Sequence, residues 1–318
     1  MSQKLVTVVL ATYNGEKYLN EQLESLVKQT YKNLEIIVQD DCSSDNTMEV
    51  LESYKSSLNM QLSQNSKNLG YIKNFETLLK KASGEYICIC DQDDIWEHNK
   101  IEILLENIGN NSLIYSNSEL IDENGNSLNK RLSQKLKNSF ISSKSPLNFL
   151  YDNCVSAHSM MFKKDILKYA LEFPKVIYFD NWIACVAASL DGVKYVDKDL
   201  VKYRQHESNT LSINKKESAN VKSRVLNKVE KKEFEVQNTV AKIDEMSQLK
   251  CLSKSDEKIL EELKKEYMKF ENCYFNIRLF SLLFKHKELF FKITTRNSFI
   301  LVVKKSIGKK LYKVAPFL

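Results

Sequence analysis

Short apolar runs alternate with longer segments of helical periodicity over the first 110 residues, and this rhythm restricts the fold more than any other feature. Such alternation predicts an α/β domain with a largely parallel central sheet flanked by helices. Continuous apolar character in residues 6–10 and 34–38 predicts central strands covered on both faces. The expected strand and helix pairs are 5–13 with 16–29, 34–39 with 45–54, 60–63 with 71–81, and 86–90 with 96–108.

The pattern changes after residue 113. Strands are expected at 113–121, 155–162 and 193–203, a helix at 180–190, and a mobile polar loop up to residue 144. Beyond residue 212 only helical patterns follow, with apolar residues recurring from Ile259 to Phe280 and Ser255 as the expected helix cap. The sequence therefore predicts an α/β domain at 1–212 and a helical region at 213–318.

Composition excludes several classes of protein. With 318 residues and 43% apolar content, the chain can bury a full core. It has no run of 18 uncharged apolar residues and no signal-peptide pattern, so a cytoplasmic location is expected. Its seven cysteines form no Cys-x-x-Cys pair and are expected to be reduced, with Cys88 and Cys90 on one strand face. Its glycines are too widely spaced for a dinucleotide fingerprint or a P-loop.

Three aspartates in four positions, Asp91, Asp93 and Asp94, directly follow the strand predicted at 86–90. Polar clusters also follow the first two predicted strands, at 12–14 and 40–41. If these strands are parallel, all three clusters face one crevice at their carboxyl ends. Crowded carboxylates repel one another unless a cation offsets them, and a divalent metal carrying phosphate oxygens is the simplest such cation. The alternative is an acidic helix cap, which needs only one carboxylate.

Several motifs follow one another in the order and spacing of one enzyme family. They are residues 8–14, 29–31, 40–45, 68–70, 91–96, Asp180 with Trp182, and 203–206 with Asn209. On these motifs, residues 5 to about 210 resemble the inverting family 2 glycosyltransferases with a GT-A fold, especially the rhamnosyltransferase-like branch that builds bacterial surface polysaccharides. The resemblance covers about two thirds of the chain and implies a Rossmann-like GT-A domain.

The resemblance also implies a nucleotide site. Asp41 would accept a hydrogen bond from the uracil or thymine ring, since an ionised carboxylate only accepts. Asp91 would reach the ribose, and Arg204 would pair with phosphate. Helix capping is the alternative for Asp40 and Asp41. The complete set implied for the nucleotide is Ala11, Thr12, Tyr13, Asn14, Asp41, Asp91 and Arg204.

A divalent metal, Mg²⁺ or Mn²⁺, is implied on the donor diphosphate. Asp93 and His206 would bind it, with Asp94 and Asp40 as supporting residues. A lone histidine is more often structural, but His206 stands in a Tyr-Arg-Gln-His motif. His158 lies where small residues are usual, and a packed core histidine is the favoured interpretation there.

Asp180 is implied as the general base that removes the acceptor proton. Its alternative is a helix-start carboxylate favoured by the helix dipole. Trp182 would contact the acceptor, or else is an ordinary core aromatic. The family branch often has His before the catalytic Asp, whereas this chain has Phe179, so the acceptor pocket is expected to be atypical. His158 is a conceivable substitute for that imidazole.

The implied function is transfer of one sugar from a UDP- or dTDP-sugar to a glycan or lipid-linked acceptor, with inversion. The chain lacks the Gln-x-x-Arg-Trp motif of processive synthases. A non-catalytic module that binds sugar nucleotides or glycans is the first alternative. A nucleotidyltransferase is more remote, because its glycine-rich, lysine-containing loop is missing.

Charge is unevenly distributed along the chain. Residues 1–110 carry 10 Lys and Arg against 17 Asp and Glu, whereas residues 264–318 carry 13 against 3. The basic, aromatic tail predicts peripheral contact with an anionic membrane, at the inner face of the cell membrane, where lipid-linked acceptors are found. A solvated helical bundle or a homodimer contact is the alternative. Nucleic acid is not an expected partner, because the first half is acidic and no recognition motif is present.

Overall fold

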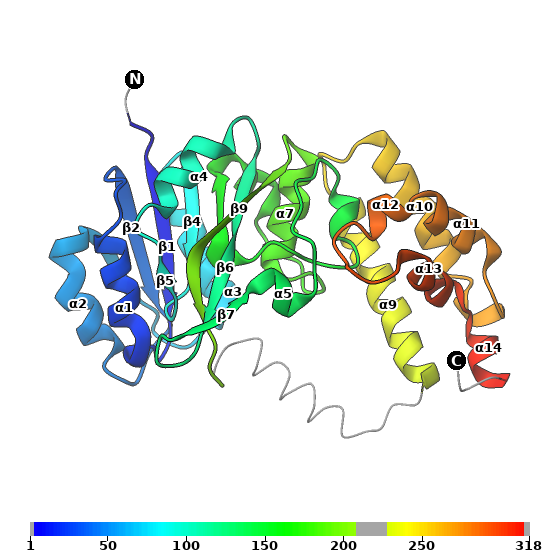
Figure 1. Ribbon diagram of the computed structural model, residues 1–318, viewed down its shortest axis with the longest axis horizontal. Coiled ribbons are helices and arrows are strands. Elements are labelled where there is room, and N and C mark those ends of the chain that lie inside the picture. Colours follow the sequence, from blue (N-terminus) through cyan, green and yellow to red (C-terminus); the bar gives the residue numbers. More distant parts are fainter. Residues whose placement is uncertain (1–2, 208–227, 315–318) are drawn as a thin grey trace.

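The computed structural model describes residues 3–207 and 228–314. A central twisted sheet is flanked by helices, and further helices lie at one end of the molecule (Figure 1). This architecture confirms the expected α/β fold with a mostly parallel sheet and C-terminal helices. The boundary expected at 212/213 and the motif residue Asn209 lie outside the described residues.

The strands are β1 (Val6–Thr12), β2 (Leu34–Asp40), β3 (Met60–Gln64), β4 (Tyr86–Cys90), β5 (Ile95–Trp96), β6 (Leu113–Ile121), β7 (Ser127–Arg131), β8 (Met160–Lys163) and β9 (Val193–Arg204). Within the described residues they form one nine-stranded sheet in the order β3-β2-β1-β4-β8-β6-β9-β5, and β7 pairs with β6. The β3, β2, β1 and β4 strands are parallel neighbours. Their carboxyl ends therefore meet at one edge of the sheet.

The helices are α1 (Glu16–Val27), α2 (Thr47–Leu58), α3 (Tyr71–Lys81), α4 (Lys100–Ile108), α5 (Leu132–Leu136), α6 (Leu167–Ala170), α7 (Phe179–Ser189), α9 (Lys228–Ser247), α10 (Lys254–Tyr267), α11 (Ile277–Lys285), α12 (Lys287–Phe290), α13 (Ser298–Ser306) and α14 (Lys309–Val314). Apolar residues of α1, α2 and α4 pack on one face of the sheet. Those of α3 and α7 pack on the other face. Both faces of the central strands are thus covered, as their continuous apolar runs predict.

Cys88 and Cys90 both belong to the core under α1 and α4, so they share one strand face as expected. All seven cysteines are free. The core on the opposite face continues from α7 into the C-terminal helices, where it includes Ile243, Leu260 and Phe290. The helical region is therefore packed against the α/β domain through a continuous apolar core.

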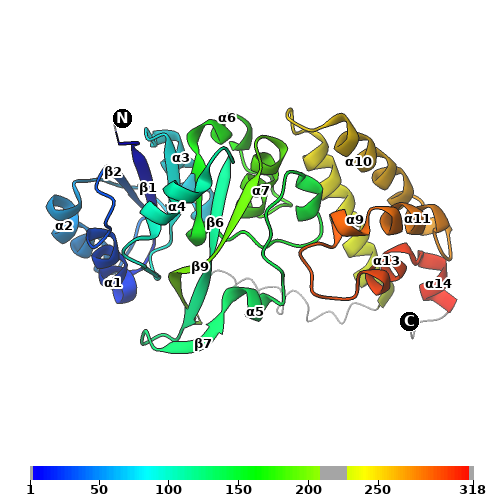
Figure 2. The same cartoon turned by 45° about the horizontal axis from the view of Figure 1, so that its top comes forward.

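Two expectations before residue 145 are wrong. Trp96 does not begin a helix, because Ile95 and Trp96 pair with β9 as a short strand and α4 begins only at Lys100. The polar segment after residue 121 is not simply a loop, since it contains β7 and α5, which extend the β6 hairpin (Figure 2). Residues of β7 are mostly exposed and polar, so backbone pairing with β6 places them without any hydrophobic signal.

Three later boundaries also differ from expectation. The strand expected at 155–162 begins only at Met160, after a turn of 3₁₀-helix at Ala157–Ser159. Ser253, not Ser255, caps α10, and its hydroxyl accepts a hydrogen bond from the Asp256 amide. The apolar spacing continues to Phe280, but α10 ends at Tyr267, because α11 packs separately against α13. When two successive helices have the same spacing of apolar residues, that spacing alone does not show where the first helix ends.

Candidate active site at the carboxyl edge of the sheet

The three polar clusters expected at one crevice are connected by hydrogen bonds. The Thr12 hydroxyl donates to Asp40 Oδ1 over 2.9 Å. The Gln92 side chain bridges the turns after β1 and β4, since its Oε1 accepts from the Tyr13 amide at 2.8 Å and its Nε2 donates to the Tyr13 carbonyl at 3.1 Å. A Cβ on Gly15 would lie 2.4 Å from that Gln92 oxygen. Glycine at position 15 therefore permits this bridge.

Residues 11–14 form the end of β1 and the turn that follows it. Ala11 is half-buried and Thr12 is buried, whereas the Tyr13 ring is 47% exposed. Asn14 adopts a left-handed conformation with φ of 46°, and its side-chain oxygen accepts from the Ser44 amide at 2.9 Å. Tyr13 thus offers an open aromatic surface, while Asn14 joins this turn to the turn after β2.

Asp40 and Asp41 are buried and extensively hydrogen-bonded. Asp40 accepts from Thr12, from the Ser43 amide and hydroxyl, and from Gln64, which uses all four acceptor positions of its carboxylate. Asp41 accepts from the backbone amides of Leu69 and Gly70, each at 2.8 Å, and from Asn65. Asp40 therefore ties strand ends together, and Asp41 retains one acceptor position.

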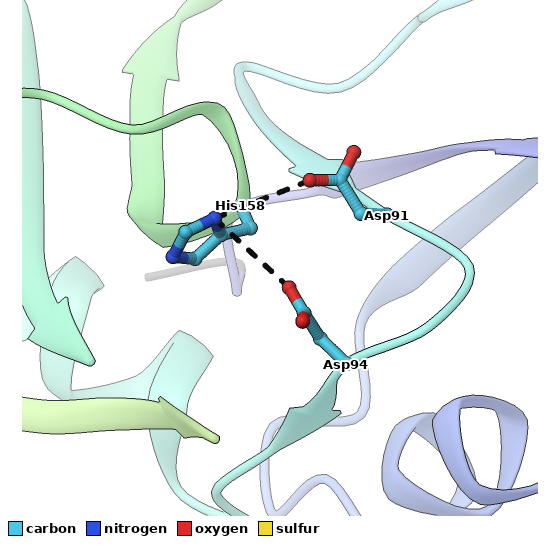
Figure 3. Close-up of side chains that lie close together, drawn as sticks. All are labelled: Asp91, Asp94 and His158. Atoms are coloured by element: carbon cyan, nitrogen blue, oxygen red, sulfur yellow. Dashed lines mark ion pairs between the residues drawn. The ribbon is translucent and has the colours of Figure 1, made fainter. Parts of the chain in front are cut away.

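Asp91 and Asp94 face His158 across the acidic turn that follows β4. Each has one carboxylate oxygen 4.0 Å from His158 Nδ1 (Figure 3). The Asp91 side chain is 35% exposed, whereas Asp94 and His158 are buried. Asp94 Oδ2 is buried and has no hydrogen-bond partner among the described residues. These three residues form a cluster that could hold a metal ion.

Asp93 and His206 form a second pair at the acidic turn. His206 Nε2 lies 2.8 Å from Asp93 Oδ2, and the imidazole packs against Tyr18 with ring centroids 4.8 Å apart. One carboxylate and one imidazole are a donor set suited to Mn²⁺, and carboxylates and waters suit Mg²⁺. The structure therefore brings together the two residues that the sequence assigned to the metal, and it adds a separate Asp91–Asp94–His158 cluster.

Two buried cations support the acidic turn. Arg204 is fully buried, where its Nε donates to the Asp93 carbonyl and its Nη2 forms an ion pair with Glu21 at 2.9 Å. Its amide donates to Asp94 Oδ1. Lys100, also fully buried, donates to the His158 carbonyl at 2.6 Å and lies 3.2 Å from the centre of the Trp96 ring. The Arg204 guanidinium is thus directed at protein groups beneath the turn.

Asp180 lies in the first turn of α7. Its Oδ1 accepts from the Asn181 amide at 2.6 Å. The pKa of Asp91 is raised mainly by burial and by Asp93, and the charge of Asp180 adds a smaller contribution, so Asp180 lies within electrostatic range of Asp91. Trp182, by contrast, is buried in the core, where its indole N–H donates to the Ala170 carbonyl at 3.0 Å. Asp180 therefore lies within electrostatic range of the acidic turn, whereas Trp182 is the core aromatic that was the alternative to an acceptor contact.

Burial and charge crowding change the proton affinities of the site. Burial raises the pKa of Asp180 to about 6. Burial and the neighbouring Asp93 raise the pKa values of Asp91 and Asp94 above the ordinary range. Burial lowers the pKa of Lys100 to about 8, and burial together with Lys100 lowers the pKa of His158 to about 3. His158 is therefore neutral, and its Nε2 contacts the Ser118 hydroxyl at 2.9 Å.

Sequence reasoning missed Lys100 and Gln92 as members of the site. Lys100 had a detectable signal, since it falls on the same helical face as the buried Ile101, Leu104 and Ile108. A lysine on an apolar face requires a buried partner. Gln92 carries no comparable signal, because its role depends on the approach of the β1 turn in space.

Comparisons with known proteins give a consistent result. A sequence model described as Glycosyl transferase family 2 matches residues 7–170. An uncharacterized glycosyltransferase of Methanocaldococcus jannaschii is 34% identical over 68% of this chain and 77% of its own length. The dTDP-rhamnosyl transferase RfbG of Shigella flexneri is 32% identical over 64% of this chain and 74% of its own.

Another relative is matched over about half its own length. It is the UDP-Glc:alpha-D-GlcNAc-diphosphoundecaprenol beta-1,3-glucosyltransferase WfgD of Escherichia coli, 39% identical over 39% of this chain and 49% of its own. Among solved structures, TarS of S. aureus in complex with UDP-GlcNAc superposes with a TM-score of 0.60 at 20% identity, covering 94% of this chain and 81% of that one. At this identity the superposition establishes a common fold.

Proposed function

Because the chain belongs to glycosyl transferase family 2, we propose that it transfers a sugar from a nucleoside-diphosphate sugar to a hydroxyl group of a glycan acceptor. The observation that supports this proposal is the acidic turn itself, where Asp93 Oδ2 lies 2.8 Å from His206 Nε2 directly after β4, with Asp180 within electrostatic range of Asp91. The turn supplies groups for a donor diphosphate, and Asp180 supplies a base next to it. Both are needed in one crevice for sugar transfer.

The donor is a UDP- or dTDP-sugar in this proposal. The exposed Tyr13 ring gives a stacking surface for the base, with Ala11, Thr12 and Asn14 around it. The remaining acceptor position of Asp41 suits the imide N–H of a pyrimidine. Asp91, whose side chain is 35% exposed, accepts hydrogen bonds from the ribose hydroxyls in this proposal. The relatives support this choice, since RfbG is named for a dTDP-sugar and WfgD for a UDP-sugar.

Asp180 acts as the general base. Its raised pKa of about 6 gives the carboxylate more proton affinity than an ordinary aspartate while leaving it ionised at neutral pH. Within the described residues, its Oδ2 has no hydrogen bond, so this oxygen is available to the acceptor hydroxyl. The hydroxyl oxygen attacks the anomeric carbon as the bond to the diphosphate breaks, the proton passes to Asp180, and the configuration inverts.

Asp93 and His206 would hold a divalent cation, Mg²⁺ or Mn²⁺. Such a cation would supply positive charge to offset that of the departing diphosphate. Arg204 has a positioning role here, since its contacts with the Asp93 carbonyl and the Asp94 carboxylate hold the acidic turn in place. The Asp91–Asp94–His158 cluster is less suited to the diphosphate, because the Asp94 side chain is fully buried, whereas that of Asp93 is 17% exposed.

The acceptor is a lipid-linked glycan, and one sugar is added per acceptor in surface-polysaccharide synthesis. WfgD supports this assignment, because its name specifies a diphosphoundecaprenol-linked acceptor. Within the described residues, no helix is long and apolar enough to cross a membrane. An enzyme using such an acceptor would work at the inner face of the cell membrane through peripheral contact.

Calorimetric binding of UDP and dTDP, with and without Mn²⁺, tests the donor site. We expect metal-dependent binding that Asp93→Asn strongly weakens. Asp165→Asn is the matched control, because Asp165 is an exposed aspartate that pairs with Lys168. If Asp94→Asn abolishes metal-dependent nucleotide binding and Asp93→Asn leaves it unchanged, the cation binds at the Asp91–Asp94–His158 cluster instead. If neither nucleotide binds to the folded protein with either metal, the glycosyltransferase proposal is wrong and a glycan-binding role takes its place.

A further inference from the structure

An exposed apolar surface lies on α11 and α13, at the end of the molecule remote from α1 and α2 (Figure 1). The side chains of Ile277, Phe284, Phe299 and Ile300 are 74%, 44%, 52% and 50% exposed. The Phe284 and Phe299 rings are both in contact with Phe280, at centroid distances of 5.8 and 6.2 Å. The three phenylalanine rings therefore form one aromatic cluster across the two helices, and Ile277 and Ile300 are exposed on the same helices.

Cations predominate along the segment that contains this surface, and the nearby acidic groups Glu262 and Glu266 lie on the neighbouring helix α10. Residues 274–312 contain nine Lys and Arg and one acidic residue, Glu288. Arg278 and Lys285 flank the apolar residues of α11, and Arg296 and Lys304 lie beside those of α13; all four are exposed. No ion pair involves any of these four within residues 3–207 and 228–314. We call these cations and the five apolar residues the aromatic–basic face.

We infer that the aromatic–basic face binds the surface of an anionic lipid bilayer. Phenylalanine and isoleucine side chains enter the boundary between headgroups and acyl chains, and lysine and arginine attract anionic headgroups. Opposite charge selects this occupant over a second copy of the chain. In a symmetric dimer through this face, the cations would lie against the same cations, and like-charge contacts are unfavourable.

This inference specifies the surface that would bring the proposed enzyme to a lipid-linked acceptor, although its evidence is independent of the active site. Flotation with vesicles tests it, using phosphatidylglycerol with phosphatidylcholine and phosphatidylcholine alone. We expect binding to the anionic vesicles only, and weaker binding at higher salt. Phe284→Ser with Phe299→Ser, and separately Arg278→Gln with Lys285→Gln and Lys304→Gln, should each lower binding on the order of tenfold.

Matched controls remove equivalent groups elsewhere. Tyr169→Ser removes another exposed aromatic, and Lys32→Gln with Lys67→Gln and Lys80→Gln removes three exposed lysines; neither should change vesicle binding. Circular dichroism and UDP binding show whether each variant is folded. The inference is overturned if the folded wild type does not bind anionic vesicles, or if the face variants bind these vesicles as tightly as wild type does. It is also overturned if the only effect of the face variants is to convert a dimer to a monomer. Vesicle binding by folded protein that binds neither UDP nor dTDP would instead contradict the proposed function alone.

Discussion

The acidic turn and the aromatic–basic face handle charge in opposite ways. At the turn, Asp94, Lys100 and Arg204 are fully buried, and their cations donate to protein groups. On the face, the cations are exposed and outside any ion pair among the described residues. Buried charges cost desolvation energy and must be held in fixed geometry, whereas exposed charges are screened by water and salt. Buried charges in fixed geometry therefore suit a site that orients reacting groups. Exposed charges suit reversible attraction to an anionic surface.

Replacing the base tests the turn most severely. Asp180→Asn should lower turnover by ~10²–10⁴-fold and leave donor binding nearly unchanged, because the amide keeps the shape but cannot take the proton. The rate of nucleoside diphosphate release measures the first effect, and calorimetry measures the second. Asp191→Asn, an exposed position just beyond α7, is the control. Equal turnover in Asp180→Asn and wild type would remove Asp180 from the mechanism.

Removing a buried cation should destabilise the fold. Lys100→Met deletes the donor to the His158 carbonyl and a buried positive charge that favours the ionised forms of Asp91 and Asp94, so the free energy of unfolding should fall by on the order of 3 kcal/mol. Denaturation with urea measures this change. Lys80→Met, an exposed position at the end of α3, should stay within about 0.5 kcal/mol of wild type. If both variants lower the free energy of unfolding by the same amount, the buried charge of Lys100 does not stabilise the fold.

The pH dependence of turnover should reveal the burial of Asp180. Since its pKa is raised to about 6, the rate should decline as pH falls through 6, by about tenfold per unit below it. The effect on stability has the opposite sign. The fold favours the protonated carboxyl, so this group stabilises the protein at low pH and that contribution is lost as pH rises through 6. Turnover that stays constant down to pH 5 would show that Asp180 is not the titrating base.

The smallest effect is expected for an exposed cation. Lys285→Gln should change the free energy of unfolding by less than about 0.5 kcal/mol, because Lys285 is solvated and outside the core. Urea denaturation beside the Lys100→Met variant gives the direct comparison. A loss of more than about 1 kcal/mol in Lys285→Gln would mean that the face is part of the folded core and not a free surface.

The sequence predicted the strands that form the crevice with little error. Tyr86–Cys90 and Leu113–Ile121 have the expected bounds, because continuous apolar runs indicate buried strands. The acidic turn directly follows β4, as its sequence predicts, and the role of Asp180 stays a prediction. The β7 strand could not be predicted in this way, since an exposed edge strand is placed by backbone pairing and needs no apolar side chains.

By itself, the sequence determined the fold class, the edge of the sheet that carries the polar clusters and the basic character of the C-terminal region, because hydrophobic periodicity and net charge are local properties. Only the tertiary structure decided which charges are buried. It placed Arg204 beneath the acidic turn, brought Lys100 to the His158 carbonyl and filled the acceptor positions of Asp40. Burial and hydrogen bonding depend on residues far apart in the chain, so no local pattern contains them.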